Sequence, residues 1–167
     1  MKRPLLLGFV AAVALTAIDM IFFGASDESR IRDRLDQLAA AVRIDEDELS
    51  PLPRAGRIRS EFADIFTKDA SASVAELDET FDGRDAMAVA AAQIVGVYRS
   101  ADVSFDDVTV RVDEAHADVK ATATVTGAMH GRSLSREELP VTLKLKKSDG
   151  DWKIVSAVVA LRRDSNE

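Results

Sequence analysis

The fold of this chain is decided by the stretch Leu139-Pro-Val-Thr-Leu-Lys-Leu-Lys-Lys147, Ser148-Asp-Gly-Asp151, Trp152-Lys-Ile-Val-Ser-Ala-Val-Val-Ala-Leu161. Two apolar, β-branched runs flank the pair Asp149-Gly150, and this arrangement is a strong local signal for a β-hairpin. The second run is apolar on both of its faces, so we expect it in the middle of a sheet that is covered on both sides. The upstream segments are then expected to form the covering layers.

The register of this hairpin stays open at the level of sequence. A two-residue turn at Asp149-Gly150 would pair Leu145 with Ile154. A three-residue loop would instead pair Leu143 with Val155. Because both faces of the second strand are apolar, the hydrophobic pattern does not choose between the two registers.

Length and composition predict one domain with a short appendage. The chain has 167 residues, of which 47% are hydrophobic, which is enough to bury a core without covalent cross-links. It contains no cysteine, so disulfides, thiolate metal sites and a cysteine nucleophile are excluded. The formal net charge of -7 argues against nucleic acid as a partner, because nucleic-acid binding needs a concentrated basic face.

The N-terminal segment, residues 1–26, is predicted to be a membrane anchor that crosses the bilayer through residues 4–24. Asp19 is the one charged side chain in that stretch, and about 20 residues of helix span the apolar core of a bilayer. Basic residues precede the stretch and acidic residues follow it, so the positive-inside rule places the remaining chain outside the inner membrane of a bacterium. The alternatives are a signal peptide cleaved near Gly24-Ala25-Ser26, which would release a secreted domain, and an internal helix of a cytosolic fold.

Helical spacing of apolar residues predicts three helices after the anchor. In the first helix Ile31 and Leu35 begin the apolar stripe, and Ser26 or Asp27 can cap its start. Asp82 is expected to cap the third helix. The predicted helices cover residues 27–42, 53–66 and 84–99.

Alternation of apolar and polar residues predicts the strands. The run over 103–113 changes face at Asp106-Asp107, where a β-bulge would restore the alternation. The run over 117–126 alternates without interruption. The remaining predicted pieces are a short strand over 70–77, a loop over 78–83, a long polar connection over 127–138 and a frayed tail over 163–167.

Three short motifs support a family resemblance: Glu61-Phe-Ala-Asp-Ile-Phe-Thr-Lys-Asp-Ala70, Phe81-Asp-Gly-Arg-Asp-Ala86 and Asp149-Gly-Asp-Trp-Lys-Ile154. In order and spacing they resemble three parts of the NTF2-like (SnoaL-like, cone-shaped α+β) superfamily: the step from helix to first strand, the start of the third helix, and the final hairpin. The resemblance implies that residues 27–162 form an α+β domain, with a curved antiparallel sheet packed on three helices, preceded here by one transmembrane helix.

The resemblance also implies a conical pocket between the helices and the sheet. Members of the superfamily include isomerases, dehydratases, hydrolases and cyclases of small apolar molecules. Others are non-catalytic binding or scaffold domains, often dimeric through the sheet, so the fold alone leaves function open. A homodimer through the sheet face and envelope-protein partners are therefore among the expectations for this chain.

Ten residues are candidates to line that pocket, because the resembled fold builds it from the second and third helices and the inner face of the sheet. Five of them could form hydrogen bonds with a ligand, and five would form apolar walls. The polar candidates are Asp64, Gln93, Tyr98, Thr122 and Thr124, and the apolar candidates are Phe62, Phe66, Ile94, Val125 and Trp152.

No metal site or cofactor is predicted. His116 and His130 are too far apart in the sequence to define a metal site without a carboxylate ligand that the sequence does not locate. The run 78–83 has the first half of a calcium-loop pattern, but Val89 stands where the loop needs a bidentate glutamate.

The sequence favours a non-enzymatic function, a membrane-anchored extracytoplasmic module that binds a ligand or helps to assemble an envelope complex. The alternative is a small-molecule enzyme of the isomerase or dehydratase type that uses the cone pocket. The isomerase pattern requires a tyrosine and carboxylic acids facing the pocket. Here Tyr98 is the single tyrosine and is expected at a helix end, and the inward strand positions are mostly apolar.

Overall fold

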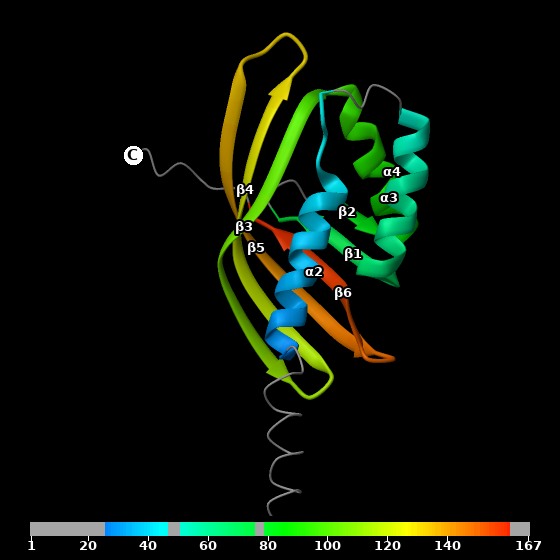
Figure 1. Cartoon of the computed structure of the whole chain (residues 1–167), viewed down its shortest axis with the longest axis vertical. Helices are drawn as coiled ribbons and strands as arrows, with labels where there is room; N and C mark the ends of the chain where they lie inside the picture. The colour runs from blue at the N-terminus through cyan, green and yellow to red at the C-terminus, as the bar shows by residue number, and fades with distance from the viewer. Residues whose placement is uncertain (1–25, 47–50, 76–78, 161–167) are drawn as a thin grey trace, which may run out of the picture.

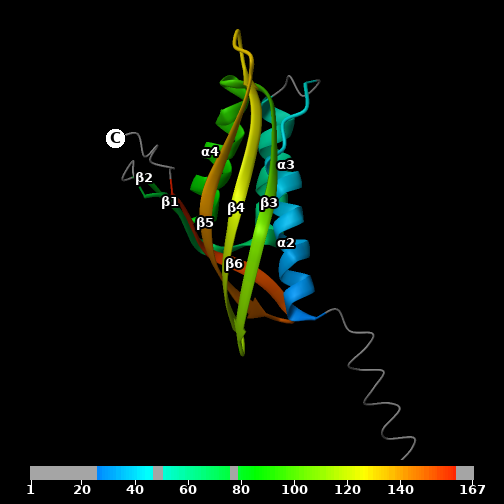
Figure 2. The same ribbon diagram turned by 90° about the vertical axis from the view of Figure 1, so that its left-hand side faces the viewer.

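The computed structural model describes residues 26–46, 51–75 and 79–160. Three helices cover one face of a curved six-stranded sheet (Figures 1 and 2). The elements are α2 (Asp27–Val42), α3 (Pro51–Ile65), β1 (Phe66–Val74), β2 (Glu79–Asp82), α4 (Arg84–Gln93), a 3₁₀ helix (Ile94–Gly96), β3 (Tyr98–Asp113), β4 (His116–Met129), β5 (Leu134–Ser148) and β6 (Asp151–Val159).

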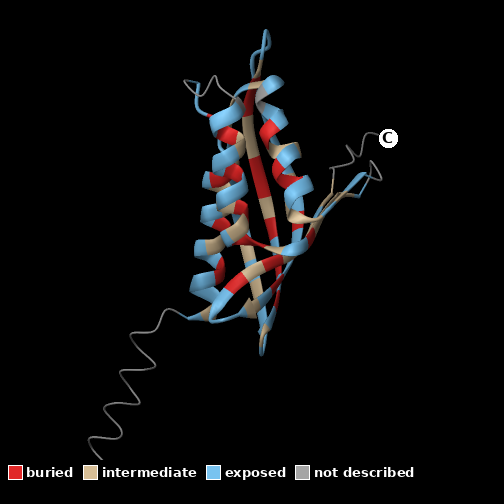
Figure 3. Cartoon of the chain, turned by 90° about the vertical axis from the view of Figure 1, so that its right-hand side faces the viewer, coloured by how far each residue is buried: buried red, intermediate tan, exposed pale blue. Residues whose placement is uncertain are grey.

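The sheet has the strand order β2-β1-β6-β5-β4-β3, and its pairs are antiparallel except for β1 with β6. The helices bury their apolar faces against the sheet, so the buried positions in Figure 3 lie between the two layers. At the centre of this core Trp152, Ile154 and Leu143 are each at most 1% exposed.

Helix α2 has the predicted bounds because both its cap and its apolar stripe are present. The Ser26 side chain accepts a hydrogen bond from the Ser29 backbone N–H at 3.1 Å. Ile31 and Leu35 are buried on the side that faces the sheet. The other end of α2 is held by Arg54 of α3, which is 1% exposed and donates hydrogen bonds to the carbonyl oxygens of Val42 and Arg43, at 3.1 and 2.8 Å.

The first residue of α2 is bound to the final hairpin. The Asp27 carboxylate oxygen Oδ1 accepts hydrogen bonds from Lys147 Nζ at 2.7 Å and from Trp152 Nε1 at 3.0 Å. The bonds from Lys147 and Trp152 hold the pKa of Asp27 below its ordinary value of 3.8. This contact fixes the N-terminal end of α2 against β5 and β6.

The hairpin of β5 and β6 has the two-residue turn, with Asp149 and Gly150 both at positive φ, at 53° and 87°. Leu145 pairs with Ile154, as that register requires. A β-bulge then shifts the register, so the far end of the hairpin follows neither predicted pairing.

The bulge also corrects the expectation that the sheet is covered on both sides. It moves the core-facing positions of β6 from Trp152 and Ile154 to Ala157 and Val159, which all face the helices. Among the described residues the helices cover one face of the sheet, and the change of core-facing positions at the bulge explains why both faces of this strand look apolar in the sequence. Val158, on the other face, is 40% exposed.

The bulge predicted in the run 103–113 is confirmed. The pairing of β3 with β4 shifts between Asp106 and Thr109, and Asp107 has a φ of 52°. Val103 and Phe105 before the bulge, and Val110 after it, all pack against the core.

Three predicted boundaries around α4 are wrong. The run 78–83 is not a loop, because residues 79–82 form β2 and pair with β1. Gly83 is the cap residue of α4 and makes no side-chain cap bond, so Asp82 does not cap the helix. The helix ends at Gln93 rather than near residue 99, and Tyr98 begins strand β3.

The polar connection predicted over 127–138 is also wrong, because most of it is strand. Residues 127 and 128 pair with 135 and 134, and the hairpin of β4 and β5 extends beyond the helices as an arm (Figure 1). In the described part of the chain no helix packs on the arm, so its strands need no apolar face and their sequence resembles a loop. Leu134 on the arm is 67% exposed.

The predicted anchor, residues 4–24, lies outside the described residues. Within the ranges that the structure describes, no helix is both long enough and apolar enough to cross a bilayer.

Candidate functional site

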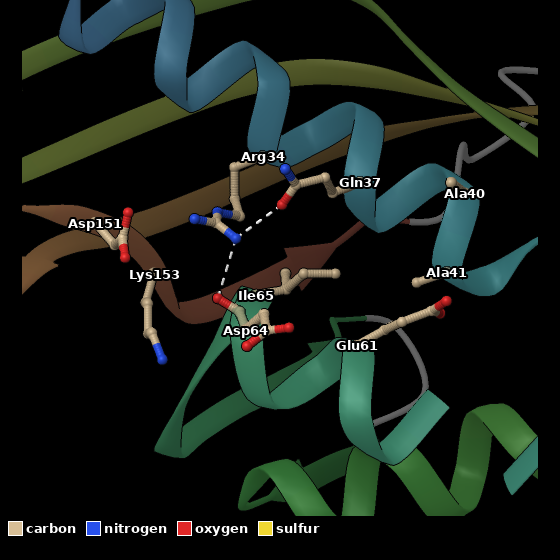
Figure 4. Close-up of a pocket in the computed structure, with 9 residues that line it drawn as sticks. All are labelled: Arg34, Gln37, Ala40, Ala41, Glu61, Asp64, Ile65, Asp151 and Lys153. Atoms are coloured by element: carbon tan, nitrogen blue, oxygen red, sulfur yellow. Dashed lines mark hydrogen bonds between the residues drawn. The ribbon is translucent and has the colours of Figure 1, made fainter. Parts of the chain in front are cut away.

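A cleft between α2, α3 and the start of β6 is the best-formed candidate site in the described part of the chain (Figure 4). Its volume of about 520 Å³ is in the range of small-molecule sites. Small apolar side chains lie beside charged ones in its wall. The lining residues are Arg34, Gln37, Ala40, Ala41, Glu61, Asp64, Ile65, Asp151 and Lys153.

Arg34 reaches across the cleft from α2 to the end of α3 (Figure 4). Its Nη1 atom donates to Gln37 Oε1 at 2.7 Å and to the backbone oxygen of Asp64 at 3.1 Å. Its Nε atom is buried and has no hydrogen-bond partner among the described residues. A buried donor without a partner is costly, and because this atom is buried, a ligand in the cleft does not contact it in this arrangement of the side chain.

Glu61 of α3 presents the complementary group, an acceptor. Its Oε1 atom lies 3.6 Å from Arg57 Nη1. Its Oε2 atom is buried, and no described residue donates a hydrogen bond to it. Arg34 and Glu61 therefore line the cleft from opposite helices, and each has one buried polar atom that no described residue satisfies.

The other charged residues of the cleft are Lys153, Asp64 and Asp151, and among described partners the lysine is bound while the two acids are not. Lys153 Nζ donates to the backbone oxygen of Ala63 at 3.0 Å, so this lysine, like Arg34, binds a carbonyl near the end of α3. A cation is favourable at that helix end because of the helix dipole. The Asp64 and Asp151 side chains are exposed and form no ion pair with a described residue.

Of the ten predicted pocket residues, Asp64 lines the cleft. Phe62, Phe66 and Trp152 are 3%, 4% and 1% exposed and belong to the core, with the rings of the two phenylalanines 4.9 Å apart. Val125 is partly buried. For the three aromatic residues the structure therefore shows packing positions in the core.

Thr122 and Thr124 lie on the face of β4 that points away from the helices. Side chains alternate along a strand, and the neighbouring Ala121 and Ala123 are the ones buried toward the core. The Thr124 hydroxyl donates to Asp106 Oδ2 at 3.0 Å, across to β3. Alternation along β4 thus places the two threonines on the opposite side of the sheet from the expected cone pocket.

The three remaining candidates, Gln93, Ile94 and Tyr98, lie at the end of α4 or just after it. Gln93 is exposed and Ile94 is 44% exposed. The Tyr98 ring packs against Gly127, so close that a Cβ at residue 127 would lie 3.0 Å from it. Asp64 and Tyr98 line different parts of the molecule and do not form the predicted polar set.

The residues that sequence reasoning missed are Arg34, Gln37, Glu61 and Lys153. A spacing signal existed, because residues three apart share a side of a helix, as do Arg34 with Gln37 and Glu61 with Asp64. The histidines play no part in the cleft, since His116 and His130 are both exposed. The described ranges contain no group of three or more potential metal-binding side chains.

Comparison with known proteins identifies the family. The SnoaL-like domain matches residues 56–158, more than half of the chain. A search of curated proteins returns no match.

Solved structures share the fold at low sequence identity. An NTF2-like superfamily protein from Salmonella enterica serovar Typhimurium LT2 is 11% identical, with a TM-score of 0.64 over 81% of this chain and 91% of that one. The hexachlorocyclohexane dehydrochlorinase LinA-type3 from Novosphingobium barchaimii LL02 is 15% identical, with a TM-score of 0.63 over 83% and 88%. A protein assigned provisionally as a scytalone dehydratase from Novosphingobium aromaticivorans DSM 12444 is 18% identical, with a TM-score of 0.60 over 89% of each chain.

At these identities the structural likeness establishes the NTF2-like fold, and the match over residues 56–158 establishes the family. The chain is a member of the SnoaL-like domain family.

Proposed function

We propose that this chain binds a small polar molecule in the cleft between α2 and α3. The observation that supports this most directly is the cleft itself, whose wall combines the charged side chains of Arg34, Glu61 and Lys153 with small apolar ones. Small-molecule sites are typically concave and place a few polar groups among apolar walls, where they fix the orientation of a ligand. The cleft volume of about 520 Å³ accommodates such a ligand.

A second candidate is catalysis in the same cleft, by elimination from a small molecule. Glu61 would act as the base and take a proton from a carbon atom, the C–H electron pair would form a double bond, and a leaving group would depart with its own pair. Two solved structures of the same fold are named as a dehydrochlorinase and, provisionally, as a dehydratase, and both names describe eliminations. These relatives favour the enzymatic alternative over a purely structural module.

The other expectations remain predictions. No described residue bears on an envelope complex, a location outside the inner membrane or a homodimer through the sheet. A small-molecule site is compatible with any of these settings.

The binding proposal is tested by filling the cleft. Ala40 is exposed at the cleft wall, so Ala40→Trp should block the cleft without disturbing the core. Ala86→Trp is the matched control, because Ala86 is an exposed helical alanine on α4, outside the cleft.

Ligand-observed NMR on the full chain, with a panel of amino acids, hydroxy acids, short amines and short carboxylates, would measure the effect. We expect compounds that bind the wild type and the Ala86→Trp variant to lose at least about tenfold in affinity for the Ala40→Trp variant. Equal binding to all three proteins, or no binding from the whole panel at millimolar concentration, would contradict the proposal. Release of water from a bound hydroxy acid, with formation of a double bond, would favour the catalytic candidate.

A further inference from the structure

We infer that a groove along the open edge of β3 binds an extended, basic segment of a partner protein, which adds a short strand to the sheet. Ala39 and Ala40 of α2 line one wall of this edge groove, and residues 103–105 of β3 line the other. Figure 2 shows α2 alongside β3. Among their lining residues the edge groove and the cleft share Ala40, so the inference goes beyond the proposed function and does not depend on it.

The outward backbone groups of Val103 and Phe105 are available for pairing. β3 is an edge strand, and every second residue of such a strand directs its N–H and C=O away from the sheet. Ala101 is one of these residues, because it exchanges two hydrogen bonds with Ile44, at 2.8 and 3.0 Å. Alternation gives Val103 and Phe105 the same direction, and no described backbone group bonds to either of them on that side. The edge therefore presents two donors and two acceptors to an added strand.

Two contacts bound this unpaired stretch, and one of them shows that the edge accepts a strand. Ile44, which follows the end of α2, already pairs with β3 in the antiparallel direction. On the other side, the Val108 carbonyl oxygen accepts a hydrogen bond from Arg32 Nη2 at 2.9 Å. An extended segment of about five residues, at about 3.3 Å per residue, fits along the edge between these two contacts.

The space beside the unpaired stretch has room for such a segment. The edge groove has a volume of about 320 Å³, and it exists because the α2 wall consists largely of small side chains, Ala39 and Ala40. Val103 and Phe105 pack against the core and remain partly exposed. Apolar side chains of a bound segment would cover that exposed surface, which favours binding.

The charges around the unpaired stretch select a basic segment. Asp102, Asp106 and Asp107 flank the stretch along β3, and Asp36 lies in the α2 wall. Arg43 is the cationic residue of the groove, and its charge is already compensated by Asp102 at 2.7 Å. Lysine or arginine side chains at the ends of a bound segment would therefore meet carboxylates of opposite charge, which gives specificity for a basic partner.

The same charges disfavour a second copy of this chain as the occupant. Pairing of two β3 edges about a twofold axis at Ser104 would set Val103 of one copy opposite Phe105 of the other. Asp102 of one copy would then lie opposite Asp106 of the other, and like charges directly opposite each other destabilise a strand pair. Acidic residues on an edge strand thus protect it from pairing with itself.

Three peptides test the inference on the full chain. Acetyl-Lys-Val-Thr-Val-Lys-amide is basic and can extend as a strand. Its fully N-methylated form keeps the side chains and the charge but lacks every backbone N–H, and acetyl-Glu-Val-Thr-Val-Glu-amide reverses the charge. Dissociation constants from ligand-observed NMR should show that the first peptide binds at least about tenfold more tightly than each of the other two.

Hydrogen exchange and proline substitution locate the contact on the backbone. Saturation with the basic peptide should slow exchange of the Val103 and Phe105 amides at least about tenfold and leave the Val110 amide, beyond the bulge, unchanged. Val103→Pro removes one outward donor, which an edge strand tolerates, and should weaken the peptide about fivefold. Val110→Pro, at the equivalent edge position beyond the bulge, is the matched control.

Side-chain substitutions test the groove and its charge. Ala39→Trp fills the edge groove without entering the cleft and should weaken the basic peptide at least about tenfold, with Ala86→Trp on α4 as the control. Asp36→Lys should weaken it about fivefold, whereas Asp33→Lys, an exposed acid of α2 outside the groove, should leave its affinity unchanged. Because Asp36 is exposed, this variant tests the inference independently of any effect of the other substitutions on folding.

Several results would overturn the inference. Equal binding of the basic peptide and either comparison peptide would remove the role of the backbone donors or of the charge. The absence of binding at millimolar concentration, or unchanged affinity in the Ala39→Trp and Asp36→Lys variants, would remove the site. Self-association of the wild type in sedimentation experiments, abolished by Ala39→Trp, would identify a second copy as the occupant in place of a basic partner.

Discussion

The contact between Asp27 and the final hairpin leads to a quantitative prediction about stability. Asp27→Ala removes the acceptor of two hydrogen bonds, one from the Lys147 ammonium group and one from the Trp152 indole N–H. Trp152 is 1% exposed, so its N–H would lose its partner in a buried setting. Asp27→Asn keeps an oxygen in place and removes the charge.

The magnitude follows from the exposure of the two partners. A hydrogen bond to a charged group contributes about 1.5–3 kcal/mol, but the Lys147 and Asp27 side chains are 31% and 34% exposed, so we take about 1 kcal/mol for this pair. The loss of the indole partner adds about 1 kcal/mol. We therefore expect the free energy of unfolding to fall by about 2 kcal/mol for Asp27→Ala and by about 1 kcal/mol for Asp27→Asn.

The pH dependence gives a second measure of the same contact. The pKa of Asp27 is lowered in the folded state, so its charge stabilises the fold above an unfolded-state pKa of about 3.9. That stabilisation is lost as the pH falls through the lower folded-state pKa. The difference in the free energy of unfolding between wild type and Asp27→Asn should therefore have its maximum value at pH 7 and should decrease below about pH 4.

Urea unfolding of the full chain, followed by circular dichroism and by the fluorescence of Trp152, the single tryptophan, would measure both effects. Asp33→Ala and Asp33→Asn are the matched controls, because Asp33 is an exposed acid of the same helix. The reasoning is refuted if Asp27→Ala and Asp33→Ala destabilise the protein equally, or if the effect of Asp27→Asn is the same at pH 7 and pH 3.

Two further predictions concern the backbone and a buried arginine. Gly150→Ala should destabilise the fold by about 1 kcal/mol because Gly150 has a φ of 87°, whereas Gly56→Ala, inside α3 with open space around it, should stabilise it by about 0.5–1 kcal/mol. A urea midpoint that falls for Gly150→Ala and rises for Gly56→Ala would confirm the two predictions, and equal shifts would contradict them. In the same assay Arg54→Met should lower the free energy of unfolding by about 2–3 kcal/mol, because the carbonyl oxygens at the end of α2 lose their donors. Arg59→Met, at an exposed position of α3, is the control and should lower it by less than about 0.5 kcal/mol.

The sequence predicts those parts of the fold where local and tertiary signals agree. Helix α2 has a serine cap and an apolar stripe at one spacing, and its predicted bounds are correct. The change of face at Asp106-Asp107 correctly located a bulge. Strand β2 was missed because it has four residues, of which Phe81 packs against the core, and so short a strand shows no clear alternation. The arm of β4 and β5 was missed because no described helix packs on it, so the pattern of a buried strand is absent there.

The site was harder to predict because it depends on how separate elements meet. Asp64 was named, but Arg34 and Glu61 are charged helix residues that look like ordinary solvated positions in the sequence. Their significance comes from the approach of α2 to α3, which places both side chains in the wall of one cleft. Conversely, the alternation along β4 already placed Thr122 and Thr124 opposite the apolar positions, and the family resemblance outweighed that local signal.

The position of the last strand has a consequence for synthesis. β6 lies between β1 and β5, so the strand made last separates the first two strands of the sheet from the other three. Until residues 151–159 have been translated, β1 lacks its parallel partner and the two parts of the sheet share no strand pairing. Pairing of such distant segments is slow, because loop-closure entropy opposes it. The sheet is therefore completed only after residues 151–159 have left the ribosome, and a truncation before Asp151 would leave two partial sheets with exposed edges.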